Sequence, residues 1–519
     1  MRTVFIIYIV TGKDRKSYWR KHAPKPKNIR TRQENIIVRL PGPTPATKNL
    51  QEPLDIWNYF MDKNIISLIV ENTNKYIVSI QQNYSRERDA NATDEFEIRA
   101  LFGLLYLAGL SHANRLNLED VWSREGYGVE IFYLTMTLQR FRFLLRHLRF
   151  DDKETRADRR KFDKLAPIRQ VFELFIANCR KGYYHSPFVT VDEILAGFRG
   201  RCSFRQYIPS KPNKYGLKIL AVSDAKMFYT SNLEVYVGSQ PNGPFQKSNS
   251  PTDVVLRLCD HISGTCRNIT MDNWFTSIPL VQILLREHKL TVIGTLRKNK
   301  RELPLEFSKP INRKIHSSMF GFTSDLTLVS YIPRRGKNVL LVSSLHHHDE
   351  IDPSTGNQNK PFIITEYNET KGGVDVVDKL CASYDCARNT RRWPMVIFFN
   401  MLNIAGINAQ VIFSANNPDT DIRRRFFLRK MANGLIAPHL QRRASMTNLP
   451  RALKFRLQEM VGAEAADQQQ NIIPGRCSYC DSKKNRKSRF SCFKCNVYMC
   501  LEHITPICTT CRESAFQNE

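Results

Sequence analysis

Between residues 54 and 150, apolar positions recur with the period of an α-helix. Within the segment 94–110, Phe96, Ala100 and Leu104 fall on one face, which is the pattern of an amphipathic helix. This part of the chain is therefore predicted to be a set of packed helices.

The pattern changes after residue 186 to short apolar runs that are rich in β-branched residues. The expected strands are 187–198, 215–224, 231–238, 267–275 and 290–297, and the expected helices are 252–263 and 277–288. Three strands followed by alternating helix and strand describe an α/β layer, in which successive strands can place carboxylates at one edge. With a further helix expected at 371–380, this is the order of a ribonuclease H-like fold.

The remaining segments divide the chain into several domains, as its length of 519 residues suggests. Turn-rich, basic residues interrupt the layer as an insertion with short strands, and helical periodicity then resumes. The proline-containing start is predicted to be a flexible basic arm, either a solvated tail or a DNA contact. The expected boundaries are 1–50 for this arm, 51–186 for the first helical part, 187–297 for the first α/β part, 298–361 for the insertion, 362–384 for the second α/β part, 385–463 for the second helical part, 464–474 for a polar linker and 475–513 for a Cys-rich module.

Net charge is the first indication of a partner. Lys and Arg number 78 against 49 Asp and Glu, which gives a formal charge of +29. Such a surplus is costly by self-repulsion unless a polyanion binds, and DNA or RNA is the commonest one, although a merely soluble basic surface is the alternative. We recognise no apolar run long enough to cross a bilayer and expect no membrane partner.

Several aspartates occupy positions where a carboxylate is expensive to bury. Asp192 lies within an apolar strand and Asp272 closes another, while Asp375 and Asp378 follow two glycines at helical spacing. Taken singly, such residues are more often turn caps, salt bridges or first-turn helix residues. Together they offer the oxygen ligands that Mg²⁺ prefers, and Mn²⁺ accepts the same set. Two such ions can activate the attacking and leaving oxygens of a phosphoryl transfer on DNA.

The cysteines gather at the C-terminus in the pattern C-x2-C-x11-C-x2-C-x4-C-x2-H-x4-C-x2-C. Eight ligands suit two tetrahedral Zn²⁺ ions with no open position. The spacing favours interleaved pairing, a cross-brace, over sequential pairing. The first ion would take Cys477, Cys480, Cys500 and His503, and the second would take Cys492, Cys495, Cys508 and Cys511. Recognition of DNA, a structural role and chromatin binding all remain open for this module.

Long strings along the chain resemble the piggyBac transposase family, in the family's order and spacing. They are VDEILAGFRGRCSFRQYIPSKPNKYGLKIL, CRNITMDNWFTSIPL, LTVIGTLRKNKRELP, YNETKGGVDVVDKL and CARNTRRWPMVIFFNMLNIAGIN. The resemblance implies that Asp192, Asp272 and Asp375 are the catalytic, Mg²⁺-binding aspartates and that Asp378 is the fourth aspartate beside them. It also implies a split helical domain for DNA binding and dimerisation, hairpinned transposon ends, insertion at TTAA and seamless excision by a nuclear homodimer.

Basic and aromatic residues near these motifs are candidates for DNA contact, because cations bind phosphates and aromatic rings stack on bases. For Trp393 a buried position at a helix start is equally compatible. Tyr215 and Trp274 are assigned to the core. The candidates are Arg199, Arg201, Lys214, Arg297, Lys300, Arg392 and Trp393.

Three functions are compatible with these features. The first is a metal-dependent, cut-and-paste DNA transposase with Mg²⁺ and two Zn²⁺ ions. The second is a domesticated derivative that binds DNA or chromatin without mobility; loss of a catalytic aspartate would favour it, and none is lost. The third, a zinc-dependent ubiquitin ligase, leaves the chain before the Cys-rich module unexplained.

Overall fold

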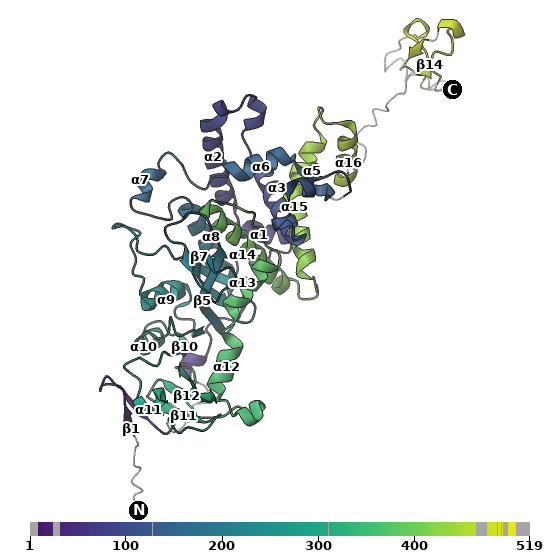
Figure 1. Cartoon of the computed structure of the whole chain (residues 1–519). Helices are drawn as coiled ribbons and strands as arrows, with labels where there is room; N and C mark the ends of the chain where they lie inside the picture. Colours follow the sequence, from purple (N-terminus) through teal and green to yellow (C-terminus); the bar gives the residue numbers. More distant parts are fainter. Residues whose placement is uncertain are drawn as a thin grey trace, which may run out of the picture. The chain divides into compact units, whose positions relative to one another are not determined.

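The computed structural model describes residues 9–23, 32–126, 128–309, 311–462, 475–484, 486–488, 490, 492 and 497–504. The chain forms two compact units, Met1–Arg442 and Arg443–Glu519. Figure 1 shows the elements of both, and each unit is described by itself.

Helices dominate the first part of the larger unit, as the apolar periodicity predicts. They are α1 (Pro53–Phe60), α2 (Lys63–Ile80), α3 (Glu95–Leu110), α4 (Leu118–Trp122), α5 (Glu130–Thr135), α6 (Leu138–His147), α7 (Arg156–Arg160) and α8 (Arg169–Gly182). The side chains of Asp62, Asp94 and Thr137 accept hydrogen bonds from backbone N–H groups three residues ahead, at the starts of α2, α3 and α6. Side-chain caps of this kind stabilise a helix start, because the first N–H groups have no partner within the helix.

The predicted α/β layer is present. Its strands are β5 (Phe188–Gly197), β7 (Tyr215–Asp224), β8 (Thr230–Val235), β9 (Asn268–Met271) and β10 (Thr291–Thr295), with α9 (Pro251–Cys259) and α10 (Ile278–Arg286) between them in the chain. The spatial order is β8–β7–β5–β9–β10. β7 runs antiparallel to β5 and β8, whereas β5, β9 and β10 are mutually parallel. Parallel neighbours bring the carboxyl ends of β9 and β10 to the same side of the sheet.

The two faces of this sheet are covered differently. On one face Val191, Met271 and Val292 pack in a buried cluster with residues of α9 and α10. On the other face Ile293 packs with residues of α12 (Phe362–Thr370), and α13 (Gly373–Ser383) follows α12 directly. Because side chains alternate along a strand, one residue in two on β5 and β9 faces α12 and α13.

The insertion continues the same sheet. β11 (Ser318–Phe322), β12 (Thr327–Arg334) and β13 (Lys337–Ser343) are antiparallel neighbours, and β13 pairs with β10. A short helix, α11 (Leu305–Ser308), precedes them. Two further small strand pairs are β3 (Gly42–Pro43) with β4 (Tyr183–Tyr184) and β6 (Gln206–Tyr207) with β7.

The prediction of a flexible arm at residues 1–50 is wrong for much of the described part. β1 (Ile9–Thr11) and β2 (Tyr18–Arg20) pair with each other, and β2 pairs with β11. Trp19 is only 1% exposed and belongs to the main buried cluster. Burying so large an apolar side chain fixes this segment to the sheet.

The helix α14 (Trp393–Asn416) corrects a second expectation. By length and composition it could cross a membrane, which the sequence analysis did not recognise. Yet 89% of its most apolar window is buried inside the protein, as in the core helix of a globular fold. α15 (Arg424–Ala444) follows it and spans the point where the two units divide.

In the smaller unit the described elements are few. They are α16 (Arg451–Val461), an antiparallel pair, β14 (Gly475–Arg476) with β15 (Lys487–Ser488), and two short 3-10 helices, η7 (Ser482–Lys484) and η8 (Leu501–His503). The predicted linker 464–474 lies outside the described residues.

Candidate functional site

Asp192 and Asp272 occupy equivalent places on adjacent parallel strands. Val191 of β5 lies opposite Met271 of β9, which in turn lies opposite Gly294 of β10. The next residues along these strands are Asp192, Asp272 and Thr295, so the register places the two carboxylates side by side. Residues far apart in the chain meet here because the sheet aligns them.

Hydrogen bonds from this face of the sheet hold the start of α13. The Thr190 hydroxyl donates to the Thr370 carbonyl at 2.7 Å and accepts from Gly373 N–H at 3.2 Å. The hydroxyls of Thr270 and Thr370 are 2.7 Å apart. Strands β5 and β9 therefore fix the turn between α12 and α13 next to the aspartates.

Of the two glycines at the start of α13, Gly372 and Gly373, only Gly373 is tightly packed. A Cβ on Gly373 would lie 2.4 Å from Thr190 Oγ1, whereas a Cβ on Gly372 would meet nothing within 4 Å. The absence of a side chain at residue 373 thus lets α13 approach β5. This approach brings Asp375, in the first helical turn, and Asp378 to the edge that carries Asp192.

Lys211 lies among these carboxylates. Its Nζ is 3.1 Å from Asp375 Oδ1 and 3.1 Å from the carbonyl oxygen of Glu193. Burial alone would lower the pKa of Lys211, but the charges of Asp375, Asp192 and Asp378 raise it. The structure therefore brings three of the four predicted aspartates around one ammonium group, with Asp272 beside Asp192. The sequence does not predict this position of Lys211 among the aspartates.

Burial makes the ionised form costly for three of these aspartates, Asp192, Asp272 and Asp378, whereas Asp375 is exposed. Together with the charge of Glu193, burial raises the pKa of Asp192 to about 7. It also raises the pKa values of Asp272 and Asp378. Ionised carboxylates in such surroundings require nearby cations, which is a property of metal-binding and catalytic sites.

A second lysine, Lys218, contacts two residues that neighbour the aspartates, Trp274 and Glu193. The Trp274 N–H donates to Asp272 Oδ1 at 2.9 Å. Lys218 Nζ lies 4.4 Å from the centroid of the Trp274 ring and 3.7 Å from Glu193 Oε2. Trp274 packs against the main core, as predicted, and through its backbone it also orients a candidate catalytic carboxylate.

A basic cavity of about 1290 Å³ begins at this edge. Asp378 lines it, and several cationic residues lie along the same cavity. Arg115 was not predicted from the sequence, because the fold brings it here from a distant part of the chain. The cations are Arg115, Arg199, Arg201, Lys214 and Arg391.

The other candidate DNA contacts lie elsewhere. Arg297 is exposed and donates through Nε to Asn273 Oδ1 at 3.1 Å, one residue from Asp272. Lys300 lines a smaller hollow with Arg297. DNA contact by this pair stays a prediction.

The side chains of Arg392 and Trp393 contact other residues of the protein. Arg392 donates to the carbonyls of Arg146 and Leu148 at the end of α6, at 2.9 and 2.5 Å. Burial, reinforced by nearby arginines, lowers the pKa of Arg392 to about 9. The Trp393 ring packs edge-on against Phe204 at 5.0 Å. Their contact with DNA stays a prediction, and the exposed Arg391 is the better placed arginine of this segment.

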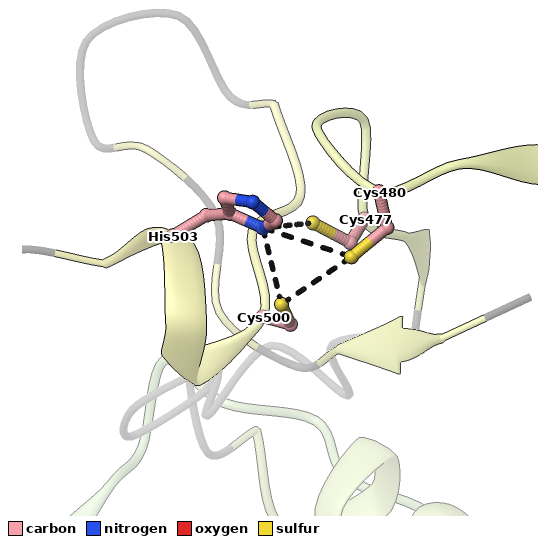
Figure 2. Close-up of side chains that lie close together, drawn as sticks. All are labelled: Cys477, Cys480, Cys500 and His503. Carbon is pink, nitrogen blue, oxygen red and sulfur yellow. Dashed lines mark hydrogen bonds between the residues drawn. The ribbon is translucent and has the colours of Figure 1, made fainter. Parts of the chain in front are cut away.

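The smaller unit brings together the first predicted set of zinc ligands. Figure 2 shows Cys477, Cys480, Cys500 and His503 pointing toward one another. His503 Nδ1 lies 3.3 to 3.6 Å from the three sulfurs, and all four ligand atoms are within 4.8 Å of one another. The described residues contain no other such group. This grouping is the one that interleaved pairing predicts for the first set.

The second predicted set can be followed only in part. Cys492 is described, whereas Cys495, Cys508 and Cys511 lie outside the described residues. Two hydrogen bonds to backbone carbonyls lie beside the first set: Cys477 N–H donates to the Arg486 carbonyl at 2.9 Å, and the Ser488 hydroxyl donates to the Met499 carbonyl at 2.5 Å.

Comparisons with known proteins give the family. The family model described as "Transposase IS4" matches residues 52–410. The human PiggyBac transposable element-derived protein 3 is 22% identical over 372 residues, which cover 68% of this chain and 60% of the relative. The human PiggyBac transposable element-derived protein 2 is 22% identical over 357 residues, covering 66% and 58%. The chain thus spans about three fifths of the length of these relatives.

A solved structure is similar over nearly the whole chain. It is the cryo-EM structure of the piggyBac transposase synaptic complex with hairpin DNA, which is 37% identical with a TM-score of 0.77. The match covers 91% of this chain and 100% of that one. The two therefore share both sequence and the mixed α/β fold, and this chain belongs to the piggyBac family of transposases, enzymes that cleave and transfer DNA.

Proposed function

We propose that the protein is a cut-and-paste transposase that binds the terminal repeats of its element, excises it through hairpin ends and integrates it at TTAA. The observation that carries this proposal is the convergence of Asp192, Asp375 and Asp378 around Lys211, with Asp272 beside Asp192 at the end of the adjacent parallel strand. The basic cavity that begins at Asp378 provides a path for a DNA backbone.

The sheet supports a ribonuclease H-like catalytic domain. The order along the chain, three strands followed by alternating helix and strand, is the one expected from sequence. In space these five strands lie in the order β8–β7–β5–β9–β10, with β7 antiparallel to both β5 and β8. In this arrangement the middle of β5 and the end of β9 share one edge, and the helix after the insertion adds the remaining carboxylates. Helices before and after this layer form the proposed split domain for DNA binding and dimerisation.

We assign Mg²⁺ or Mn²⁺ binding to Asp192, Asp272 and Asp375, with Asp378 beside them. The residues fit, because buried carboxylates with raised pKa values need cations. In the described residues no three of these aspartates have carboxylate oxygens that all lie within 4.8 Å of one another. When bound, such ions make an oxygen nucleophile available at neutral pH and stabilise the leaving oxygen of a phosphoryl transfer.

The chain's own residues prepare this edge. Trp274 N–H holds one oxygen of Asp272, so that the other is available as a ligand. Glu193 N–H does the same for Asp192 at 2.8 Å. Lys211 holds Asp375 toward the sheet and limits repulsion among the carboxylates.

In the smaller unit we assign one Zn²⁺ to Cys477, Cys480, Cys500 and His503, a Cys₃His set with the donor chemistry of a structural site. A second Zn²⁺ is assigned to Cys492, Cys495, Cys508 and Cys511 on spacing alone. Its proposed role is recognition of transposon-end DNA. We further propose a homodimer that acts in the nucleus, since two element ends must be held together where the DNA is.

The names of the human relatives favour one second candidate. Proteins called transposable element-derived share this family, so a domesticated DNA- or chromatin-binding protein is the alternative. Intact aspartates at all four positions favour the enzyme.

The test is cleavage of the DNA that flanks the gene. Purified full-length chain is incubated with duplexes that carry the flanking inverted repeats, in Mg²⁺ or in EDTA, and products are resolved on denaturing gels. The proposal predicts Mg²⁺-dependent nicks at the element boundary followed by hairpin products. Specific binding to the repeats without any strand cleavage in Mg²⁺ or Mn²⁺ would support the domesticated alternative instead.

A further inference from the structure

Two solvent-exposed tyrosines face each other at the edge of the sheet. Tyr207 of β6 and Tyr215 of β7 are direct cross-strand partners, and they are 55% and 46% exposed. Their ring centroids lie 4.8 Å apart at an interplanar angle of 41°. Sequence analysis placed Tyr215 in the core, and this assignment is wrong.

Arg205 extends this aromatic pair. Its guanidinium carbon lies 5.4 Å from the centroid of the Tyr215 ring, and Nη1 donates to the carbonyls of Arg199 and Gly200 at 2.9 and 3.0 Å. These bonds hold the guanidinium near the ring while Arg205 stays exposed. Two rings and a planar cation thus form one surface, which we name the tyrosine platform (Arg205, Tyr207 and Tyr215).

The tyrosine platform borders the basic cavity that begins at Asp378. Tyr215 lines that cavity, as do Lys214, Arg199 and Arg201. At this point β7 lies close to β5, because a Cβ on Gly216 would lie 2.4 Å from the Ala196 carbonyl oxygen of β5. One continuous surface therefore contains a carboxylate of the candidate active site, several cations and an exposed aromatic pair.

Cations beside exposed aromatic rings indicate which class of ligand this surface would bind. Bases in a paired duplex stack on each other and leave no free face for a tyrosine, whereas an unpaired base presents its ring to any aromatic surface. Proteins that bind single-stranded nucleic acid combine stacking aromatics with a cationic track for the backbone. Cation–π contact from Arg205 adds to the same kind of binding.

We propose that the tyrosine platform stacks an unpaired base of the DNA strand whose backbone follows the basic cavity to Asp378. The inference rests on the proposed function in one respect, that DNA is the ligand. It adds that the DNA beside the active site is locally single-stranded, and it names the residues that bind the exposed base.

The test compares two DNA probes of equal duplex length and sequence, one blunt and one with a four-nucleotide single-stranded extension that carries 2-aminopurine. Full-length wild type is expected to bind the extended probe more tightly and to quench its fluorescence by stacking. Changing Tyr207→Ala and Tyr215→Ala together should lower affinity for the extended probe by roughly 5- to 150-fold per base stacked. Affinity for the blunt probe should stay as in wild type.

Matched variants separate stacking from folding. Tyr207→Phe with Tyr215→Phe keeps both rings and should keep the preference and the quenching. Tyr18→Ala removes an equally exposed tyrosine, 61% exposed, from another strand and should change neither. Wild type without preference for the extended probe, or a double alanine variant that retains the preference, would overturn the inference while leaving DNA binding in place. Failure of wild type to bind either probe would instead remove the proposed function, and the inference with it.

Discussion

The two candidate metal centres of this protein are built in opposite ways. Asp192, Asp272 and Asp375 come from distant parts of the chain, and a large sheet with buried cores on both faces positions them. Cys477 and His503 come from one short segment, in which the described buried side chains are Cys477, Ser488 and Cys500. The fold itself positions the first centre, whereas the proposed zinc ion would supply most of the folding free energy of the second.

This difference predicts a different effect of metal removal at each of the two centres. At the sheet edge, metal relieves repulsion among carboxylates that the fold has already assembled, so its removal should cost activity and leave the structure. In the Cys-rich module, metal replaces a hydrophobic core, so its removal should cost the structure itself.

The largest expected effect is that of Asp272→Asn. An amide keeps the oxygen that accepts from Trp274 N–H but removes the charge, so folding and DNA binding should stay close to wild type. Cleavage of cognate ends in Mg²⁺ should fall by roughly 1,000-fold or more. Gel-based cleavage rates measure this loss, and Asp158→Asn, at an exposed aspartate, is the matched control. Cleavage at the wild-type rate would remove Asp272 from the mechanism.

Next in size is the loss of one zinc ligand. Cys480→Ser should unfold the described part of 475–504, because metal binding supplies roughly 10 kcal/mol or more of folding free energy in such modules. Hydrogen exchange should show this segment unprotected while β5 and β7 keep their protection. Cys202→Ser, at a free cysteine of the larger unit, should leave the module protected. Loss of protection in both units would contradict the contrast between the two centres.

A methyl group at Gly373 tests the scaffold of the first centre. Gly373→Ala should push α13 away from Thr190, lower stability by about 1–3 kcal/mol and slow cleavage by about 10- to 100-fold. Gly372→Ala adds the same methyl group where nothing lies within 4 Å, so it should behave as wild type. Equal effects of the two substitutions would show that the approach of α13 to β5 is unimportant.

The smallest effect concerns a buried carboxylate at the opposite end of β7. Asp224 accepts hydrogen bonds from Ser186, Lys226 and Met227, and His185 lies 3.6 Å away. Burial alone would raise its pKa, but His185 and the backbone donors lower the pKa of Asp224 to about 2.

A folded-state pKa below the ordinary value means that Asp224 stabilises the protein above about pH 4 and loses this contribution as the pH falls toward 2. Asp224→Asn should therefore lower the unfolding free energy by about 2 kcal/mol at pH 7, and the difference should shrink below pH 4. Denaturant unfolding at pH 7 and pH 3 measures it. A difference that stays constant between these pH values would contradict the assignment.

Local sequence patterns predicted the helices and strands well, but they did not predict every contact between these elements. Apolar runs identified β5, β7, β9 and β10, and the carboxylates in or after them were visible as costly residues. The Cys and His spacing predicted which four ligands meet, because one short segment closes on itself. In both cases the relevant physics is local or follows from a simple sheet.

Other features depend on long-range packing, which leaves no local pattern. The position of Lys211 beside Asp375 depends on the path of the loop before β7. Arg392 has the sequence context of a DNA contact, yet it binds the end of α6 because α14 begins next to it. Trp19 lies in β2, a strand of three residues that is too short to show periodicity, and its burial against the sheet becomes visible only in the fold.

Divalent metal binding at the sheet edge is the central claim, and Mn²⁺ titration of the zinc-replete, full-length chain followed by electron paramagnetic resonance tests it most directly. In the presence of end DNA, wild type should bind two Mn²⁺ ions per chain in addition to zinc. A variant with both Asp192→Asn and Asp272→Asn should lose this binding and keep its melting temperature. Unchanged Mn²⁺ stoichiometry and affinity in that variant would contradict the account.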